Sequence, residues 1–124
     1  MADISIDQLA AAITNAVREY TEDVSEAIDR KVDEVAENIR ATTTADAPKR
    51  SGKYAKGFKV TKQGNQRYVW NKKDHRRVHL LEFGHAKLGG GRVQAYPHLR
   101  PAYDKHVGEL EDGVKRIIRN GGGT

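Results

Sequence analysis

Two histidines and a glutamate lie close together in the second half of the chain, and these side chains can bind metals or transfer protons. The segment is His79-Leu80-Leu81-Glu82-Phe83-Gly84-His85. A zinc-binding helix of the hydrolase type needs two histidines four residues apart, so that both imidazoles share one face. Here the histidines are six residues apart and Gly84 intervenes, so the rings diverge. The spacing indicates ordinary packing and surface histidines, and we expect no metal and no cofactor.

Other patterns that carry catalysis are also missing from the sequence. It contains no cysteine, which excludes thiol catalysis, thiolate metal sites and disulfide bonds. Three consecutive glycines precede Arg92, but a phosphate-binding P-loop needs Gly-Lys-Ser/Thr directly before a helix. Gly89, Gly90 and Gly91 instead predict a flexible loop. We therefore expect no enzymatic activity.

Positive charge is the strongest chemical signal, and it is concentrated in residues 47–77. This segment holds eleven basic residues against Asp74 alone, a local charge of +10. Such a surface is sufficient to contact nucleic-acid phosphates, although no motif for base recognition is present. A protein partner and bulk solvent are the alternatives. The basic residues are Lys49, Arg50, Lys53, Lys56, Lys59, Lys62, Arg67, Lys72, Lys73, Arg76 and Arg77.

The charge is also divided along the chain. Residues 1–45 hold ten acidic and four basic side chains, a net −6, and residues 46–124 hold seven acidic and eighteen basic, a net +11. Opposite faces of neighbouring copies can attract each other, and a head-to-tail contact closes into a ring when the rotation fits. Because exposed charge pairs contribute only ~0–1 kcal/mol each, we expect a monomer or small oligomer that forms its ring on docking.

Length and composition set broad limits on the fold. The chain has 124 residues, 37% hydrophobic and 31% charged, which predicts one domain, residues 1–124, with a modest core and a flexible tail from about residue 120. No apolar run approaches the ~20 residues that span a bilayer, and the N-terminus does not resemble a signal peptide. We expect the chain in the cytosol when it is made.

Hydrophobic periodicity predicts a long N-terminal helix. Apolar residues recur every three or four positions from Ile6 to Ile39, and the segment Ile4-Ser5-Ile6-Asp7-Gln8-Leu9 fits a capping box with a hydrophobic staple. Thr42-Thr43-Thr44 and Pro48 are expected to end this helix. It would span about 34 residues and roughly 50 Å.

Two shorter runs alternate with period two around Gly64-Asn65 and predict a β-hairpin. We expect one face of the hairpin to lie on the long helix and to cover its apolar stripe, in preference to a coiled-coil partner. That face would consist of Phe58, Val60, Tyr68 and Trp70.

A short helix at Val78–Phe83 and a second helix from Pro101 complete the predicted α+β fold. Gly84 would stop the short helix. The apolar stripe of the C-terminal helix would be Tyr103, Val107, Leu110, Val114 and Ile117. Glu82 lies in an apolar element, so we expect it to be buried with a basic partner, for which Arg76, Arg77 and Arg100 are the candidates.

Three motifs follow one another in a recognisable order. They are Tyr68-Val69-Trp70-Asn71, then His79 to His85, then Tyr96-Pro97-His98-Leu99-Arg100-Pro101-Ala102-Tyr103 after a glycine-rich gap. This series resembles the family of small tail or neck components of long-tailed phages, typified by the tenth gene product of phage HK-ninety-seven. In that family a Leu-Glu-Phe-Gly element precedes a variable loop and a Pro-x-x-x-Pro-Ala helix start.

Further positions upstream fit the same family. Pro48, Ser51-Gly52 and Phe58 stand where the family has a proline, a Ser/Thr-Gly pair and a hydrophobic strand. The resemblance covers residues 48–119, and the N-terminal helix fits by its length alone. Lys53-Tyr54-Ala55 departs from the family, which often has leucine just after the glycine.

The resemblance implies a structural subunit that works in a ring on the head–tail axis, without catalysis. Its implied partners are further copies of itself, a head connector or stopper, tail-tube or tail-terminator proteins, and non-specific contact with packaged DNA. Its implied location is the virion neck or tail, after assembly in the host cytoplasm. A small basic nucleic-acid-binding protein is the alternative, and a metal hydrolase comes third. The implied structural residues are Leu81, Glu82, Phe83, Gly84, Pro97, Pro101 and Ala102, with Gly89, Gly90 and Gly91 in an assembly loop.

Overall fold

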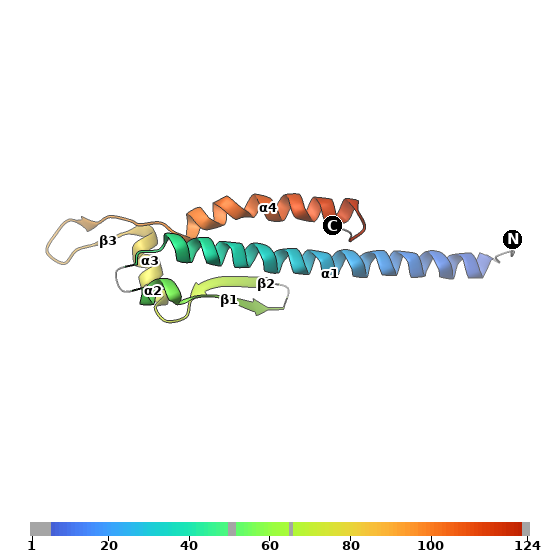
Figure 1. Cartoon of the computed structure of the whole chain (residues 1–124), viewed down its shortest axis with the longest axis horizontal. Coiled ribbons are helices and arrows are strands. Elements are labelled where there is room, and N and C mark those ends of the chain that lie inside the picture. The colour runs from blue at the N-terminus through green and yellow to red at the C-terminus, as the bar shows by residue number, and fades with distance from the viewer. Residues whose placement is uncertain (1–5, 50–51, 65, 123–124) are drawn as a thin grey trace.

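A computed structural model gives the fold of the chain and describes residues 6–49, 52–64 and 66–122. Its spine is helix α1, Ile6–Asp46, which spans 41 residues and therefore about 60 Å. Helix α4, Leu99–Arg119, runs along one side of α1, and a two-stranded hairpin runs along the other (Figure 1). This arrangement confirms the predicted α+β fold class.

Helix α1 ends later than predicted, because the three threonines at positions 42–44 lie within it. Thr43 is fully buried, and its hydroxyl donates to the carbonyl oxygen of Ile39 at 2.7 Å. This bond to the preceding turn satisfies the hydroxyl without breaking the helix. The helical pattern continues to Ala47, just before Pro48, with its amide donating to Thr43 O at 2.9 Å. The predicted capping box and staple begin outside the described residues.

The predicted hairpin is confirmed, with strands β1, Phe58–Gln63, and β2, Gln66–Asn71. Its predicted inner face is wrong for β2. The register pairs Val60 with Val69, so Val69 faces α1 while its neighbours Tyr68 and Trp70 face outward. On the outer face Trp70 is 39% exposed and donates from Nε1 to Thr61 Oγ1 at 2.7 Å. Because Tyr68, Val69 and Trp70 are consecutive bulky residues, their pattern alone does not select a face.

The core consists of two small clusters on either side of α1 and at its C-terminal end. Phe58, only 1% exposed, is central to the first, and its burial was predicted from the sequence. Ala102 is fully buried against α1 in the second, whereas Tyr103 of the predicted α4 stripe is exposed. The first cluster contains Ala47, Tyr54, Ala55 and Phe58, with Val78 and Leu81 against it. The second contains Val35, Ile39 and Ala102, with Val69, Leu99 and Leu110 against it.

Short elements connect the hairpin to α4. They are helix α2, Lys53–Lys56, helix α3, His75–Phe83, and the two-residue strands β3, His85–Ala86, and β4, Arg92–Val93. The short helix begins three residues before its predicted start and stops at Gly84 as predicted. The β3–β4 hairpin projects at the end of the molecule away from the N-terminus (Figure 1). Among the described helices, none combines the length and apolar character that crossing a membrane requires.

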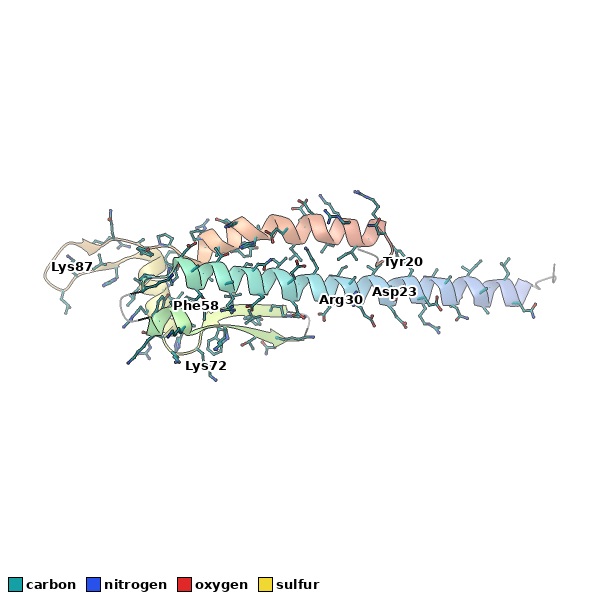
Figure 2. The ribbon with its side chains drawn as sticks, viewed as in Figure 1. Tyr20, Asp23, Arg30, Phe58, Lys72 and Lys87 are labelled. Atoms are coloured by element: carbon teal, nitrogen blue, oxygen red, sulfur yellow. The ribbon has the colours of Figure 1, made fainter. Side chains whose placement is uncertain are left out.

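The first turns of α1 extend beyond every other element. Tyr20 marks the limit, since its hydroxyl donates to the carbonyl oxygen of Ile118 at 2.7 Å near the end of α4. All described side chains from 8 to 23 are exposed, and those before Tyr20 stand clear of other elements (Figure 2). We call residues 6–19 the arm. The hairpin therefore does not cover the apolar stripe over Leu9, Ile13 and Val17, contrary to the expectation from sequence.

Candidate assembly site

Glu82, in the last turn of α3, caps the start of α4. Its side chain is only 7% exposed. Oε1 accepts hydrogen bonds from the backbone amides of His98 and Leu99 at 2.7 and 2.8 Å, and Oε2 accepts one from the Arg100 amide at 3.3 Å. A carboxylate is stabilised there because a helix N-terminus presents unpaired N–H groups and the positive end of the helix dipole. The side chain of the N-cap residue, His98, makes no capping bond itself.

This contact satisfies every free amide at the start of α4. Four N–H groups at the beginning of a helix have no partner within it. Three of them belong to His98, Leu99 and Arg100, and all three bond to Glu82. The fourth position is Pro101, which has no N–H to satisfy. The Leu-Glu-Phe-Gly element and the Pro-Ala helix start are therefore two halves of one junction, with Pro97 exposed just before it.

The predicted burial of Glu82 is confirmed, but the predicted arginine partner is wrong. Arg100 contributes its backbone N–H, while its guanidinium lies 4.0 Å from Asp104. Arg77 pairs with Asp74 at 3.1 Å. Every residue except proline has a backbone amide, so no residue type in the sequence could have identified these partners.

The end of α3 is closed by the segment that follows it. The amide of Tyr96 donates to the carbonyl oxygen of Leu81 at 2.5 Å. The guanidinium of Arg92 donates to the carbonyl oxygen of Phe83 at 2.9 Å. These bonds satisfy two of the carbonyl groups that a helix C-terminus leaves free. The junction thus fixes both the end of α3 and the start of α4.

Gly84 is required by the backbone of this junction. Its φ of +72° lies in the region that side chains disfavour, and a Cβ here would lie 2.6 Å from the carbonyl oxygen of Val93. Only glycine combines that dihedral angle with so close an approach. The motif glycine therefore allows β4 to pack against the end of α3.

His98 lies fully buried beneath the junction, a role that the sequence analysis did not assign. Its Nδ1 donates to the carbonyl oxygen of Tyr96 at 2.8 Å and lies 2.8 Å from Glu82 Oε1. A carbonyl can only accept, so Nδ1 carries a hydrogen, and in the neutral imidazole Nε2 then accepts from the Tyr54 hydroxyl at 2.5 Å. Burial, together with the nearby charge of Glu82, raises the pKa of Tyr54 well above its usual value and keeps it a donor. The rings of Tyr54 and Phe58 contact the imidazole edge to face.

The three residues considered for metal binding have separate environments. Glu82 is turned towards α4, His79 packs on Phe83 with 5.0 Å between ring centroids, and the buried Nδ1 of His85 has no hydrogen-bond partner. Within the part of the chain that the structure describes, no group of three histidine or acidic side chains is arranged to hold a metal ion.

A groove of about 650 Å³ opens beside the junction. Strand β2 and helix α3 line one side, α4 lines the other, and α1 contributes Val32, Val35, Ala36 and Ile39. Most of the lining is apolar, and Phe83 and Tyr103 each remain more than half exposed. The remaining lining residues are Arg67, Val69, His75, Val78, His79, Glu82, Leu99, Arg100 and Leu110.

Nine of the eleven predicted basic residues are exposed, and we call them the basic surface. They lie on α2, on β1, just before α3 and in its first turn. One more, Lys49, lies shortly after α1. Arg50 lies outside the described residues. Figure 2 shows Lys72 pointing into solvent. The nine are Lys49, Lys53, Lys56, Lys59, Lys62, Lys72, Lys73, Arg76 and Arg77.

Arg67 is not part of the basic surface, because it is used within the chain. Its side chain is only 2% exposed and pairs with Asp29 of α1 at 2.7 Å and with Asp33. The hydrogen bond from Arg67 lowers the pKa of Asp29, with a smaller contribution from Lys62. This double ion pair holds the inner face of the hairpin on α1.

The three glycines of the predicted assembly loop lie in the turn between β3 and β4. Gly90 and Gly91 have positive φ angles of +95° and +83°, and the amide of Lys87 donates to Gly91 O at 3.0 Å. Open space surrounds Gly89, Gly90 and Gly91, and Leu88 is fully exposed. A neighbouring molecule can therefore reach this turn. That the turn becomes ordered when it contacts such a molecule stays a prediction.

Comparison with known proteins gives one match. The sequence matches the model of a family described as "Bacteriophage HK97-gp10, putative tail-component" over residues 11–84. This range runs from the arm through the rest of α1, the hairpin and α3 to the glycine of the Leu-Glu-Phe-Gly element. The search of curated proteins and the search of solved structures found no match. The matched range covers more than half of the chain and ends before α4.

Proposed function

Because this chain belongs to the HK97-gp10-like family of phage tail components, we propose that it forms a ring at the junction of head and tail. In this proposal it is a structural protein of a long-tailed bacteriophage. It lies at the neck or at the head-proximal end of the tail, and it is needed for head–tail joining or tail completion. The family match is the observation that carries the proposal.

The exposed surfaces of the subunit support an assembly role. The arm stands clear of the rest of the chain. Its apolar residues Leu9, Ile13 and Val17 are each at least half exposed. The groove beside the junction exposes Phe83 and Tyr103. Apolar surface of this kind on a small subunit is typical of a protein that completes its burial in an assembly.

The proposed partners are further copies of the chain, a head connector or stopper, and a tail-tube or tail-terminator protein. The role is architectural, so it requires neither catalysis nor a cofactor. In this proposal the protein assembles in the host cytoplasm and stays in the neck or tail of the virion.

A nonsense mutation in the encoding phage tests the proposed role. Without the protein, DNA-filled heads and separate tails should accumulate in electron micrographs of lysates. Expression of the chain from a plasmid should restore joined, infectious particles. Infectious virions of normal appearance without the protein would contradict the proposal.

The basic surface supports contact with nucleic acid as a second role. In a ring these nine side chains would line the channel through which DNA passes, or would meet an acidic face of the next ring. A salt titration with duplex DNA separates this role from dedicated DNA binding. A dedicated binder with several phosphate contacts loses affinity steeply as salt rises. A ring subunit should bind weakly and without sequence preference.

A further inference from the structure

We propose that the groove of one copy binds the arm of the next copy, so that subunits join head to tail. This inference deepens the proposed ring-forming role and rests on it for the closure of the ring. It names the two surfaces that meet and the residues at their centre. Both surfaces are left unpartnered in the single chain.

The arm has the form of a helix that binds in a groove. Leu9, Ile13 and Val17 follow one another at intervals of four and lie on one face of α1, between 50% and 59% exposed. Such a stripe is the recognition surface of helices that lie in hydrophobic grooves. The described arm is helical throughout, so it would not need to fold on binding. The entropy cost of ordering is therefore small.

The groove offers a matching apolar surface. Val32 and Val69 lie within it, and the half-exposed rings of Phe83 and Tyr103 belong to its lining. Its volume of about 650 Å³ is enough for several aliphatic side chains. Burial of both surfaces removes apolar area that each leaves in water, and this is the driving force for association.

The arm cannot enter the groove of its own chain. Val17 of the arm and Val32 of the groove lie on the same continuous helix. Fifteen residues separate them, a rise of about 22 Å along the axis. Bringing them together would require breaking α1. Because each chain supplies one arm and one groove, a second copy is the partner that satisfies both surfaces in equal number.

Charge favours the same partner. Residues 1–23, which include the arm and the residues on either side of it, hold five acidic residues and one basic residue, a net −4, of which the arm itself carries −1. Residues 66–79, which include the β2–α3 wall of the groove, hold five basic residues and Asp74. Because Arg67 is paired with Asp29 and Asp33, the charge left to attract a partner is +3. Opposite charges on two surfaces increase the rate of encounter and fix the orientation of binding. The acidic N-terminal segment that carries the arm is therefore attracted to the basic side chains beside this wall of a neighbouring copy.

Cysteine cross-linking tests the contact, because the chain has no cysteine of its own. Two single variants, Ile13→Cys in the arm and Tyr103→Cys in the groove, are mixed and oxidised. A covalent dimer should form, since a disulfide requires the two residues to lie side by side. Both positions are exposed in the single chain, so the variants should fold.

Two matched controls accompany this pair. Asn15→Cys lies on the opposite face of the arm, because two residues turn a helix by about 200°. Lys115→Cys lies on α4, as Tyr103 does, but outside the groove and 64% exposed. Each control pairing should give roughly tenfold less covalent dimer. Equal yields in all pairings, or none in any, would overturn the proposed contact.

The double variant Ile13→Cys/Tyr103→Cys tests the head-to-tail arrangement. A head-to-tail contact should give a ladder of covalent multimers, whereas a mutual exchange of arms would stop at dimers and overturn this arrangement. Ile13→Asp should weaken self-association of the whole chain about tenfold or more, because it places a charge in an apolar groove.

The same variants separate this inference from the proposed function. If the Ile13→Cys and Tyr103→Cys chains cross-link, and Ile13→Asp both weakens self-association and blocks joining of heads and tails, both stand. If Ile13→Asp chains enter virions normally and the cysteine pairs do not react, the arm contact is wrong and the virion role stands. Absence of the wild-type chain from virions would remove the proposed function, whatever the cross-linking result.

Discussion

The carboxylate of Glu82 lies 2.8 Å from the amide nitrogen of Leu99 and so joins the end of α3 to the first turn of α4. The two residues are separated by the β3–β4 hairpin, so this contact links two helices across a long excursion of the chain. Since α4 packs along α1 and lines the groove, the cap also positions one wall of the proposed binding surface.

Removal of the Glu82 carboxylate should destabilise the fold. Glu82→Ala leaves three amides without an acceptor and should lower the free energy of unfolding by about 2–3 kcal/mol. Glu82→Gln keeps one carbonyl oxygen and should cost only about 1 kcal/mol. Urea denaturation followed by circular dichroism measures both. Glu111→Ala, whose side chain is 69% exposed, is the control and should have little effect. Equal stability of Glu82→Ala and the wild type would rule out the cap.

Gly84 and Gly89 should respond differently to alanine. Gly84→Ala places a methyl group against Val93 O at a positive φ and should cost about 1–3 kcal/mol. Gly89→Ala meets open space at a residue without positive φ and should be neutral or slightly stabilising, since alanine restricts the unfolded chain. Melting temperatures of the two variants make the comparison. A larger loss at Gly89 than at Gly84 would contradict the assigned backbone.

The outward position of Trp70 can be measured directly by fluorescence. Trp70 is the only tryptophan, and it is 39% exposed, so its emission should lie to the red of a buried indole and should be quenched by iodide. Trp70→Ala should cost less than Phe58→Ala, because the ring of Phe58 is buried and truncation of a buried phenylalanine typically costs about 3–5 kcal/mol. A blue-shifted, protected emission would instead place Trp70 against α1, as its sequence pattern had suggested.

The attachment of the hairpin should weaken in acid. Arg67 lowers the pKa of Asp29 in the folded chain. The ionised carboxylate therefore stabilises the fold at pH values above its ordinary pKa of 3.8. The contribution is lost as pH falls below that value and the folded-state carboxylate becomes protonated. Asp29→Asn should therefore reduce the acid sensitivity of unfolding.

A double-mutant cycle identifies Arg67 as the cause. Arg67→Met removes the partner of the carboxylate, so Asp29→Asn should have much less effect in that background. Urea unfolding measures the free energy of unfolding of the wild type, the two single variants and the double variant, at neutral pH and at about pH 3. Additive effects of the two substitutions would show that the ion pair does not couple the hairpin to α1.

The sequence predicted the elements whose patterns are local. The stripe from Ile6 to Ile39 identified α1, and the alternation around the turn identified the hairpin, because both signals depend only on spacing. The face of β2 was missed because three bulky residues follow one another there. The ion pairs of Arg67 with two acidic residues of α1 turn Arg67 inward. Because side chains alternate along a strand, Val69 then also faces inward, and Tyr68 and Trp70 face outward.

The candidate site was predictable only in part. The position of Glu82 within an apolar element indicated that it would be buried, and this is correct. Its partners are backbone amides 16 to 18 residues away, and backbone groups leave no signature in the sequence. The groove was not foreseen for a related reason. It forms where four elements meet, and no single segment carries its pattern.

Quantitative mass spectrometry of purified virions tests the central claim most directly. The chain should be present in joined particles at a fixed number of several copies per virion, as a ring requires, and it should co-purify with the neck or tail after the heads are disrupted. The number should not change when virions are washed in high salt, which removes proteins bound only by charge. Absence of the chain from washed, infectious virions would contradict the assignment of this protein as a structural component of the phage.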